Sequence, residues 1–307
     1  MGKVAFVFAG QGAQYPGMGK ELYAVSPAAK GMMDQAEALR PGTMNRCFYG
    51  TVEELAVTVH TQPCLFTVDL MCAAALAEKG FMPDVCAGFS LGEVAAAAFC
   101  NMLSFNKSFA FIQERARLMQ ACAEAAPGFM AAVLRLPKEQ VTALCSQFEQ
   151  VYPVNMNAPG QIVVSGSLMQ RDAFLQAVAA KGGRTMPLKV GGAFHSPLMK
   201  DAAERLLDWL NAADIQPPSL PVYANSTAKP YKGHVAELLA RQVDHPVLWE
   251  ETICHMATAH VDTFVELGPG TVLSGLIKKI LPEARTSHVE DAESLKQAIA
   301  MLEGRSA

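Results

Sequence analysis

The chain has 307 residues, of which 51% are hydrophobic and 18% are charged, and its net charge is −4. This is enough chain for one large domain or two modest ones with a sizeable packed core. The composition argues against nucleic acid as a partner, because no basic stretch is interleaved with aromatic residues.

The first predicted element is a strand over residues 3–9 that ends in the turn Gly10-Gln11-Gly12. Its apolar run is too short for a signal peptide. A dinucleotide-binding turn would need a third glycine where this chain has Tyr15. We expect instead a glycine-flanked turn that presents backbone N–H groups, as the second donor of an oxyanion hole often does.

A helix is predicted over residues 62–79, and a short strand over 85–87 leads into the Gly-Phe-Ser-Leu-Gly segment at 88–92. Glycines two positions before and after a serine let the backbone turn sharply and push the hydroxyl outward. The Ala-rich segment over 94–99 favours a helix. The pattern therefore predicts Ser90 as a nucleophile on a strand–turn–helix elbow, with a purely structural turn as the alternative.

A long helix is predicted over residues 104–126, and Pro127-Gly128 ends it. At about 100° per residue, Arg115 falls in the middle of the apolar face of this helix. A guanidinium that points into the protein needs an anion. That anion is either an internal carboxylate or the carboxylate of a bound substrate, and the residues leave both open. Arg117 falls on the polar face, where we expect it to be solvated.

The following segment changes character, with a strand, a helix, two strands, a helix and a strand in that order. This order is typical of a ferredoxin-like unit, and we interpret it as a small inserted domain. The sequence thus predicts an α/β protein with a large domain over residues 1–126 and 189–307 and a small domain over 127–188. The six elements are expected at residues 129–136, 137–150, 151–157, 161–166, 169–181 and 184–187.

The return to the large domain begins with a flexible loop over residues 191–195. Ser196-Pro197 then offers an N-cap and a proline at the first helical position. The positive end of a helix favours a neutral imidazole, which is the form that a general base needs. His195 is therefore a candidate base for Ser90, with a plain loop histidine as the alternative. A strand over 263–267 and a final helix that starts near Asp291 complete the chain.

The eight cysteines show no Cys-x-x-Cys spacing and no accompanying histidine pair at zinc-finger distances. Several lie in apolar runs, which is typical of reduced, buried thiols in a cytoplasmic protein. We expect no metal site. The longest apolar runs, such as residues 70–77, fall short of the roughly 18 residues that a membrane-spanning helix needs.

Blocks of residues along nearly the whole chain resemble the malonyl-CoA:acyl carrier protein transacylase family. One block alone is a weak signal, but the set in this order is specific. The resemblance implies a large α/β-hydrolase-like domain with a central, mostly parallel sheet and an inserted ferredoxin-like βαββαβ unit. The blocks are residues 8–14, 88–93, 113–116, 155–161, 192–196, 241–249 and 266–270.

The resemblance implies a role for each of the candidate residues. Ser90 would be the nucleophile and His195 its base. The backbone N–H groups of Gln11 and Leu91 would form the oxyanion hole.

Two further residues take their roles from the same resemblance. Arg115 would hold the free carboxylate of the malonyl group, and the main-chain carbonyl of Gln242 would orient the histidine. The chain departs from the family at Phe89, where the family often has histidine, and at Val94, where an aromatic residue is common.

The implied reaction moves a malonyl group from malonyl-CoA to the phosphopantetheine thiol of acyl carrier protein, through a malonyl-serine ester and without a cofactor, in fatty acid synthesis. A free-standing acyltransferase that serves a polyketide synthase is a close alternative. A thioesterase is disfavoured by Arg115, and a non-catalytic module that binds carrier protein is disfavoured by the intact Ser90 and His195. We expect a monomer, because no heptad run is present.

Overall fold

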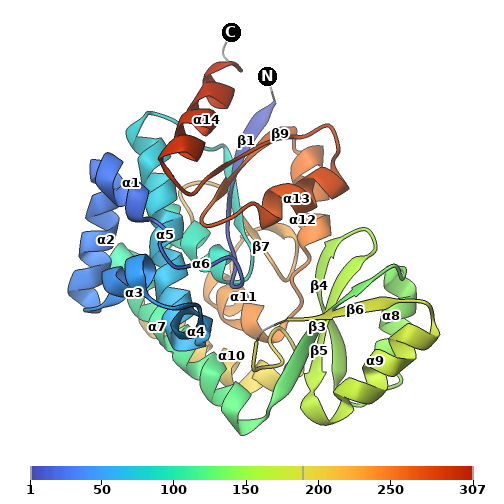
Figure 1. The fold of residues 1–307 in the computed structure, drawn as a ribbon. Coiled ribbons are helices and arrows are strands. Elements are labelled where there is room, and N and C mark those ends of the chain that lie inside the picture. Colours follow the sequence, from blue (N-terminus) through green and yellow to red (C-terminus); the bar gives the residue numbers. More distant parts are fainter. Residues whose placement is uncertain (1, 189, 306–307) are drawn as a thin grey trace.

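The computed structural model describes residues 2–188 and 190–305, which form two β-sheets with helices packed around them (Figure 1). The larger sheet has the strand order β10-β9-β1-β2-β7-β8, and only the short β7–β8 pair is antiparallel. The smaller sheet is separate and antiparallel. The predicted α/β class, with a mostly parallel central sheet, is confirmed. The strands of the larger sheet are β1 (Lys3–Phe8), β2 (Val85–Gly88), β7 (Val222–Ala224), β8 (Lys229–Pro230), β9 (Val261–Leu267) and β10 (Arg285–Val289).

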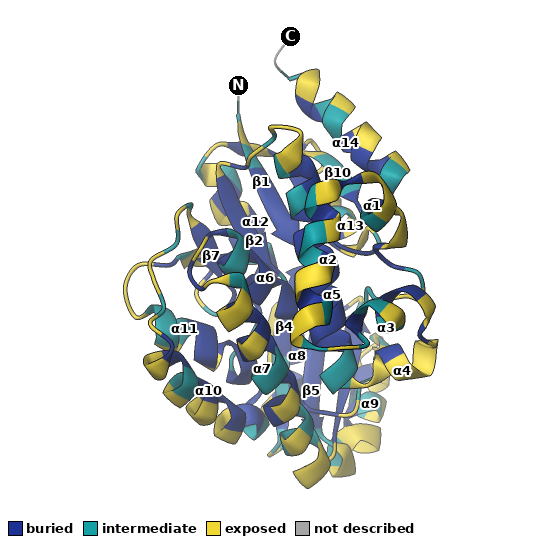
Figure 2. Ribbon diagram, turned by 90° about the vertical axis from the view of Figure 1, so that its left-hand side faces the viewer, coloured by how far each residue is buried: buried dark blue, intermediate teal, exposed yellow. Residues whose placement is uncertain are grey.

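Strand β1 lies in the middle of the larger sheet, and its side chains alternate between two hydrophobic cores. Phe6 and Phe8 belong to one core, whereas Ala5 and Val7 belong to the other. A strand that is covered on both faces is expected to read as a continuous apolar run, as this one does. Figure 2 shows the result, with buried strands in the centre and exposed residues on the outer sides of the helices.

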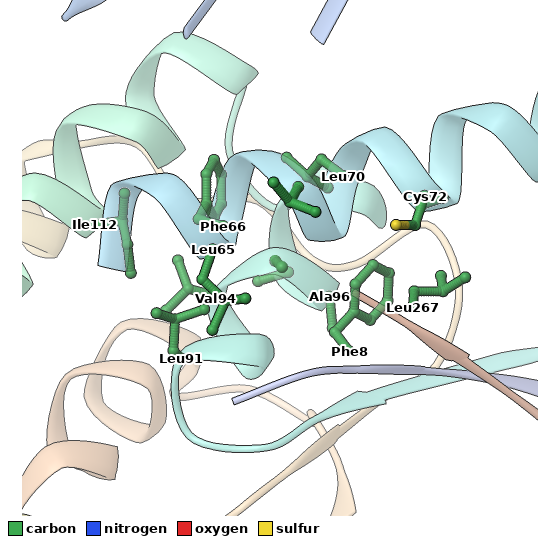
Figure 3. Packing of buried hydrophobic residues seen from close by; sticks show 14 of the residues in the cluster. Phe8, Leu65, Phe66, Leu70, Cys72, Leu91, Val94, Ala96, Ile112 and Leu267 are labelled. Carbon is green, nitrogen blue, oxygen red and sulfur yellow. The ribbon is translucent and has the colours of Figure 1, made fainter. Parts of the chain in front are cut away.

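The first core is closed by helices on the Phe8 face of the sheet. In Figure 3 the side chain of Leu65 points toward Leu91 and Val94 of the neighbouring helix. The ring of Phe66 points away from them, and its centroid lies 6.1 Å from the ring of Phe105 and 6.2 Å from the ring of Phe109. The helices that contribute to this core are α1 (Lys20–Val25), α2 (Pro27–Leu39), α3 (Thr43–Tyr49), α4 (Val52–Ala56), α5 (Thr58–Glu78), α6 (Leu91–Phe99), α7 (Phe105–Ala125), α10 (Lys200–Ala212), α11 (Val235–Arg241) and α14 (Ala292–Glu303). The opposite face is covered by α12 (Trp249–Thr258) and α13 (Val272–Ile280).

Helix α5 is the central helix of the first core. Within the described residues it is the one helix that is long and apolar enough to cross a membrane, although the sequence analysis counted only shorter apolar runs. Of its apolar window, 83% is buried inside the protein, so its composition reflects a core position.

The smaller sheet has the strand order β4-β5-β3-β6, which with two helices on one face is the ferredoxin-like arrangement predicted from the sequence. Its outer core includes Val133, Val141 and Phe174, whereas Ala132 and Val163 on the other face join the core of the larger unit. The residue bounds assigned to the two domains stay a prediction. The elements are β3 (Gly128–Leu134), α8 (Lys138–Cys145), β4 (Val151–Ala158), β5 (Gln161–Ser167), α9 (Arg171–Ala180) and β6 (Arg184–Pro187).

Several local expectations differ from the structure. The predicted helix over 137–150 ends at Cys145. The predicted helix start at Pro197 is instead a short 3₁₀ turn, and α10 begins at Lys200. The Ser196 hydroxyl accepts a hydrogen bond from the N–H of residue 198 and so caps the 3₁₀ turn, not the α-helix. All eight cysteines are free thiols as expected, but Cys254 is exposed.

Candidate active site

Ser90 lies on a sharp turn between β2 and α6, with φ 54° and ψ −103°. A Cβ atom at Gly88 would lie 1.9 Å from the backbone carbon of Gly92, and a Cβ at Gly92 would lie 2.2 Å from the Phe8 carbonyl oxygen. Only glycine fits at either position, which is the physical reason for the spacing that predicted the elbow. The turn places the serine at the carboxyl end of a central parallel strand, where open α/β sheets bind ligands.

His195 reaches the serine from the loop that follows the small sheet. The Ser90 Oγ to His195 Nε2 distance is 2.7 Å, and His195 is 4% exposed. Its Nδ1 lies 2.9 Å from the Gln242 carbonyl oxygen and 3.2 Å from the His245 carbonyl oxygen. Carbonyl oxygens only accept hydrogen bonds, so Nδ1 carries the proton and Nε2 can accept the proton of the serine.

Burial is the main electrostatic influence on this histidine. Together with the nearby charge of Arg115, burial lowers the pKa of His195 to about 4. The imidazole is therefore neutral at physiological pH, as a general base requires.

Arg115 points into the protein from α7 and is 1% exposed. Its Nη1 donates to the Gln62 Oε1 at 2.8 Å, and its Nη2 donates to the Gln242 Oε1 at 2.7 Å and to the Ser90 Oγ at 3.1 Å. All three acceptors are neutral, so the internal carboxylate considered above is not among its hydrogen-bond partners. Burial lowers the pKa of Arg115 to about 10, which still leaves it charged at neutral pH. Arg117, expected to be solvated, is exposed but pairs with Glu114 at 2.6 Å.

The turn that carries Gln11 lies directly against the elbow. A Cβ at Gly10 would lie 2.6 Å from the Phe89 carbonyl oxygen, and the Phe89 N–H donates to the Phe8 carbonyl at 3.0 Å. Leu91 is the first residue of α6, so its N–H has no partner within that helix. The two backbone segments proposed for the oxyanion hole are therefore neighbours.

Gln242 does more than the sequence suggested. Besides its carbonyl contact with the histidine, its side-chain Nε2 donates to the Ser90 carbonyl at 2.5 Å and to the Glu93 Oε2 at 2.8 Å. With the bond from Arg115 to its Oε1, this one amide side chain contacts both Arg115 and Ser90.

Sequence reasoning missed several buried polar residues behind these groups. Glu93 accepts from the Tyr231 hydroxyl and from the Asn225 backbone N–H, and burial raises the pKa of Glu93 to about 7. Gln62 holds the arginine, as described above. A signal for Glu93 existed, since a charged residue follows the elbow inside an otherwise apolar helix, but Asn225 and Tyr231 carry no local pattern.

A cavity of about 230 Å³ lies beside the elbow, between the larger unit and the small sheet. Phe89 lines it and packs edge-on against Trp249 at 5.5 Å between ring centroids. On the small-sheet side, Asn155 and Asn157 line it, and the Oδ1 atom of each is buried with no hydrogen-bond partner in the part of the chain that the structure describes. Val94, the other departure from the family pattern, is packed in the first core.

The described residues contain no group of three or more His, Cys, Asp or Glu side chains that could hold a metal ion.

Comparison with known proteins gives a consistent result across nearly the whole chain. The model of the family described as "Acyl transferase domain" matches residues 5–300. The malonyl CoA-acyl carrier protein transacylase of Bacillus subtilis (strain 168) is 39% identical over 310 residues, which cover 98% of each chain.

Solved structures are equally similar. The crystal structure of a malonyl CoA-acyl carrier protein transacylase from Clostridium perfringens has a TM-score of 0.95 at 34% identity, and the match covers 99% of this chain and 98% of that one. A second structure is described as a type II PKS acyl-carrier protein in complex with its malonyl-transacylase. It has a TM-score of 0.93 at 32% identity, with 97% and 99% of the two chains covered.

Proposed function

Because this chain belongs to the acyl transferase family and, within it, to the malonyl CoA-acyl carrier protein transacylases, we propose that it transfers a malonyl group from malonyl-CoA to acyl carrier protein. The observation that carries the proposal is the position of Arg115. Its Nη2 lies 3.1 Å from the Ser90 Oγ, so a buried cation stands beside the nucleophile. An acyl group with a carboxylate at its far end matches that arrangement.

The first half-reaction begins with the serine. Neutral His195 accepts the proton of the Ser90 hydroxyl as the oxygen attacks the thioester carbonyl of malonyl-CoA. The resulting oxyanion is held by the backbone N–H groups of Leu91 and Gln11, each worth roughly 3 kcal/mol in the transition state. The C–S bond then breaks, coenzyme A leaves with the proton from the histidine, and a malonyl-serine ester remains.

The second half-reaction reverses these roles. The phosphopantetheine thiol of the carrier protein gives its proton to His195 and attacks the ester carbonyl. The C–O bond to Ser90 breaks, and the serine oxygen takes the proton back. The enzyme is thus returned to its starting state, and the proposed kinetics are ping-pong.

Arg115 explains why malonyl is preferred to a neutral acyl group. Among the described residues Glu93 attracts Arg115 electrostatically, but no hydrogen bond joins the two side chains. The malonyl carboxylate would supply the directly bonded, charge-assisted partner that a buried guanidinium needs. The neutral Gln62 and Gln242 acceptors hold the guanidinium in place until the substrate arrives. A thioesterase acting on neutral acyl chains has no use for this cation.

The cavity beside Phe89 is the proposed site for the pantetheine arm that both substrates carry. It adjoins the elbow, and the unpartnered Oδ1 atoms of Asn155 and Asn157 offer acceptors for the amide N–H groups of that arm. The proposed chemistry uses only side chains, backbone groups and the two substrates, so it needs no cofactor.

We place the enzyme in fatty acid synthesis, as a monomer in the cytoplasm; its free cysteines fit a reducing compartment. A role with a polyketide carrier is a second candidate, because one similar structure is that of a type II PKS acyl-carrier protein with its malonyl-transacylase. Rates with a fatty-acid and a polyketide carrier protein, measured side by side, decide between the two.

The central test is intact-mass measurement after exposure to malonyl-CoA without carrier protein. We expect the protein to gain the mass of one malonyl group, to carry it on Ser90, and to lose it when carrier protein with a free phosphopantetheine thiol is added. Ser90→Ala should gain nothing, whereas Ser146→Ala, which alters an exposed serine, should behave as the unmodified protein does. An unmodified protein under all conditions would overturn the proposed function.

A further inference from the structure

The side chain of Asn225 bonds the backbone of the elbow at the point where the pairing of β2 with β7 ends. Strands β2 and β7 pair only at Cys86–Val222 and at Ala87–Tyr223. One residue past β7, the Asn225 Nδ2 donates to the Gly88 carbonyl at 2.6 Å, and its Oδ1 accepts from the Ser90 N–H at 2.7 Å. A side-chain amide therefore continues the hydrogen-bond ladder across the turn.

The elbow needs such a partner for two reasons. Ser90 has φ 54° and ψ −103°, a strained conformation for a residue with a side chain, which costs about 1–3 kcal/mol and persists only where the surroundings hold it. The Gly88 carbonyl is also buried and the Ser90 N–H is partly buried, so leaving either without a partner is costly. The Asn225 amide satisfies both groups and spans the strained residue.

The amide is itself held rigidly. Asn225 is 1% exposed, its backbone N–H donates to the Glu93 Oε1 at 3.2 Å, and its carbonyl accepts from the Leu248 N–H at 2.9 Å. Its orientation is fixed by its two partners, because a flipped amide would set oxygen against the Gly88 carbonyl oxygen and N–H against the Ser90 N–H. An asparagine at this position can make both bonds in only one way.

We propose that Asn225 is a positioning residue for the nucleophile, whose side-chain amide fixes the Ser90 backbone so that the hydroxyl stays in line with the imidazole of His195. The inference rests on the transacylase function proposed above. Asn225 touches neither the serine oxygen nor the histidine; it acts through the Ser90 backbone. Since the Ser90 N–H is engaged by Asn225, it is also unable to serve the oxyanion, which leaves that task to Leu91 and Gln11.

The most discriminating variant is Asn225→Asp, which keeps the shape of the side chain. A protonated carboxyl can still accept from the Ser90 N–H and donate to the Gly88 carbonyl, whereas an ionised one cannot donate. Burial and the neighbouring Glu93 raise the pKa of a carboxyl placed here. The activity ratio of the variant to the unmodified enzyme should therefore be highest at acid pH and fall as the pH rises.

Other groups that titrate or carry charge near this position are Glu93, Tyr231, Arg115 and His195. These groups are present in both the variant and the unmodified enzyme. Dividing the activity of the variant by that of the unmodified enzyme at each pH therefore cancels most of the effect of their titration. We expect kcat of Asn225→Asp to fall about 100-fold at pH 8, the cost of a displacement near 1 Å, with KM for malonyl-CoA little changed. Asn211→Ala, which removes an exposed amide from α10, serves as the matched control and should show neither effect.

Failure of this proposal and failure of the proposed function give different experimental results. Malonylation of the unmodified protein tests the function, whereas the rate at which a serine-directed phosphonofluoridate labels Ser90 tests the nucleophile without malonyl-CoA. We expect slow labelling in Asn225→Ala and in Asn225→Asp at pH 8, with recovery of the latter toward pH 6. A loss that is flat across pH, a change confined to KM, unmodified activity, or failure of both variants to fold at every pH would each overturn the proposal.

Discussion

Arg115 is the residue that, in the proposed function, sets substrate choice. Arg115→Ala should lose its preference for malonyl-CoA and gain use of acetyl-CoA, because the carboxylate partner disappears and the space opens. A change of about 10- to 10²-fold in the ratio of the two kcat/KM values corresponds to the 1.5–3 kcal/mol of a charge-assisted hydrogen bond. Arg117→Ala, on the exposed face of the same helix, should leave the ratio unchanged.

If Arg115→Ala kept the selectivity of the unmodified enzyme, the guanidinium would serve only to fix Gln62, Gln242 and Ser90 in the fold. The ratio of the kcat/KM values is best measured with malonyl-CoA and acetyl-CoA competing in one reaction mixture, because errors in enzyme concentration then cancel.

Gly88 decides whether the elbow can form. Its added Cβ would overlap backbone atoms of Gly92, which cannot move away as a flexible side chain would. We expect Gly88→Ala to lower the free energy of unfolding by several kcal/mol and to abolish labelling of Ser90. The matched control is Gly31→Ala, a helical glycine with open space around the added methyl, which should gain about 0.5–1 kcal/mol. Urea unfolding of both variants checks the contrast, and equal effects would contradict it.

At the level of single residues, the sequence predicted what local geometry dictates. The spacing of the glycines predicted the turn at Ser90, and the position of Arg115 on the apolar face of its helix predicted its burial. The contacts of Gln62 with Arg115 and of Asn225 with Ser90 were not predicted, because each joins segments far apart in the sequence. Neither residue lies in a recognisable sequence motif. Their roles depend on tertiary contacts that no short window of sequence contains.

Among the elements, α5 carries a buried acid that its apolar neighbours do not explain. Asp69 is fully buried, and neither of its carboxyl oxygens has a hydrogen-bond partner among the described residues. Burial together with Glu266 raises its pKa well above the usual value. A raised pKa means that the folded state keeps its proton longer than the unfolded chain. The associated stability is complete below pH 3.8 and is lost as the pH rises through the folded-state pKa.

Asp69→Asn removes this titration while keeping the volume of the side chain. The stability of the unmodified protein should fall relative to this variant by up to about 1.4 kcal/mol for each pH unit above pH 4, until the folded-state pKa is reached. Denaturant unfolding at a series of pH values measures the difference. A difference that is independent of pH would mean that Asp69 has an ion or a hydrogen-bond partner in solution.

Elements with a strong period or clear end signals were predictable, and short ones were not. The strand β1, the helix α7 and the ferredoxin-like order were found from apolar patterns and turn residues. The short helices α1, α3 and α4 and the three-residue strand β7 were not assigned, because segments of this length are held by packing rather than by their own propensity. The 13-residue helix α2 was not assigned either. Helix α5 also begins four residues earlier than expected, at Thr58, with Pro63 inside it.

For the whole molecule, the contacts between the small sheet and the larger unit predict a single unfolding transition. The Met156 N–H donates to the Val247 carbonyl at 2.9 Å, the Val247 N–H donates to the Val154 carbonyl at 2.8 Å, and the first core contains residues from both units. We expect the calorimetric and van't Hoff enthalpies of unfolding to agree. Two resolved transitions would show that the small sheet unfolds on its own.

Strand β1 pairs with β9 along its whole length, although residues 3–8 and 261–267 lie at opposite ends of the chain. During synthesis on the ribosome, the centre of the larger sheet therefore cannot be completed until most of the polypeptide has emerged. Helix α5 can pack early on α2, α6 and α7, but the part of its surface that contacts β9 and α14 stays uncovered until those elements are made. Nascent chains of this protein should consequently depend on chaperones that bind exposed apolar helices, and they should aggregate when translation stalls before residue 261.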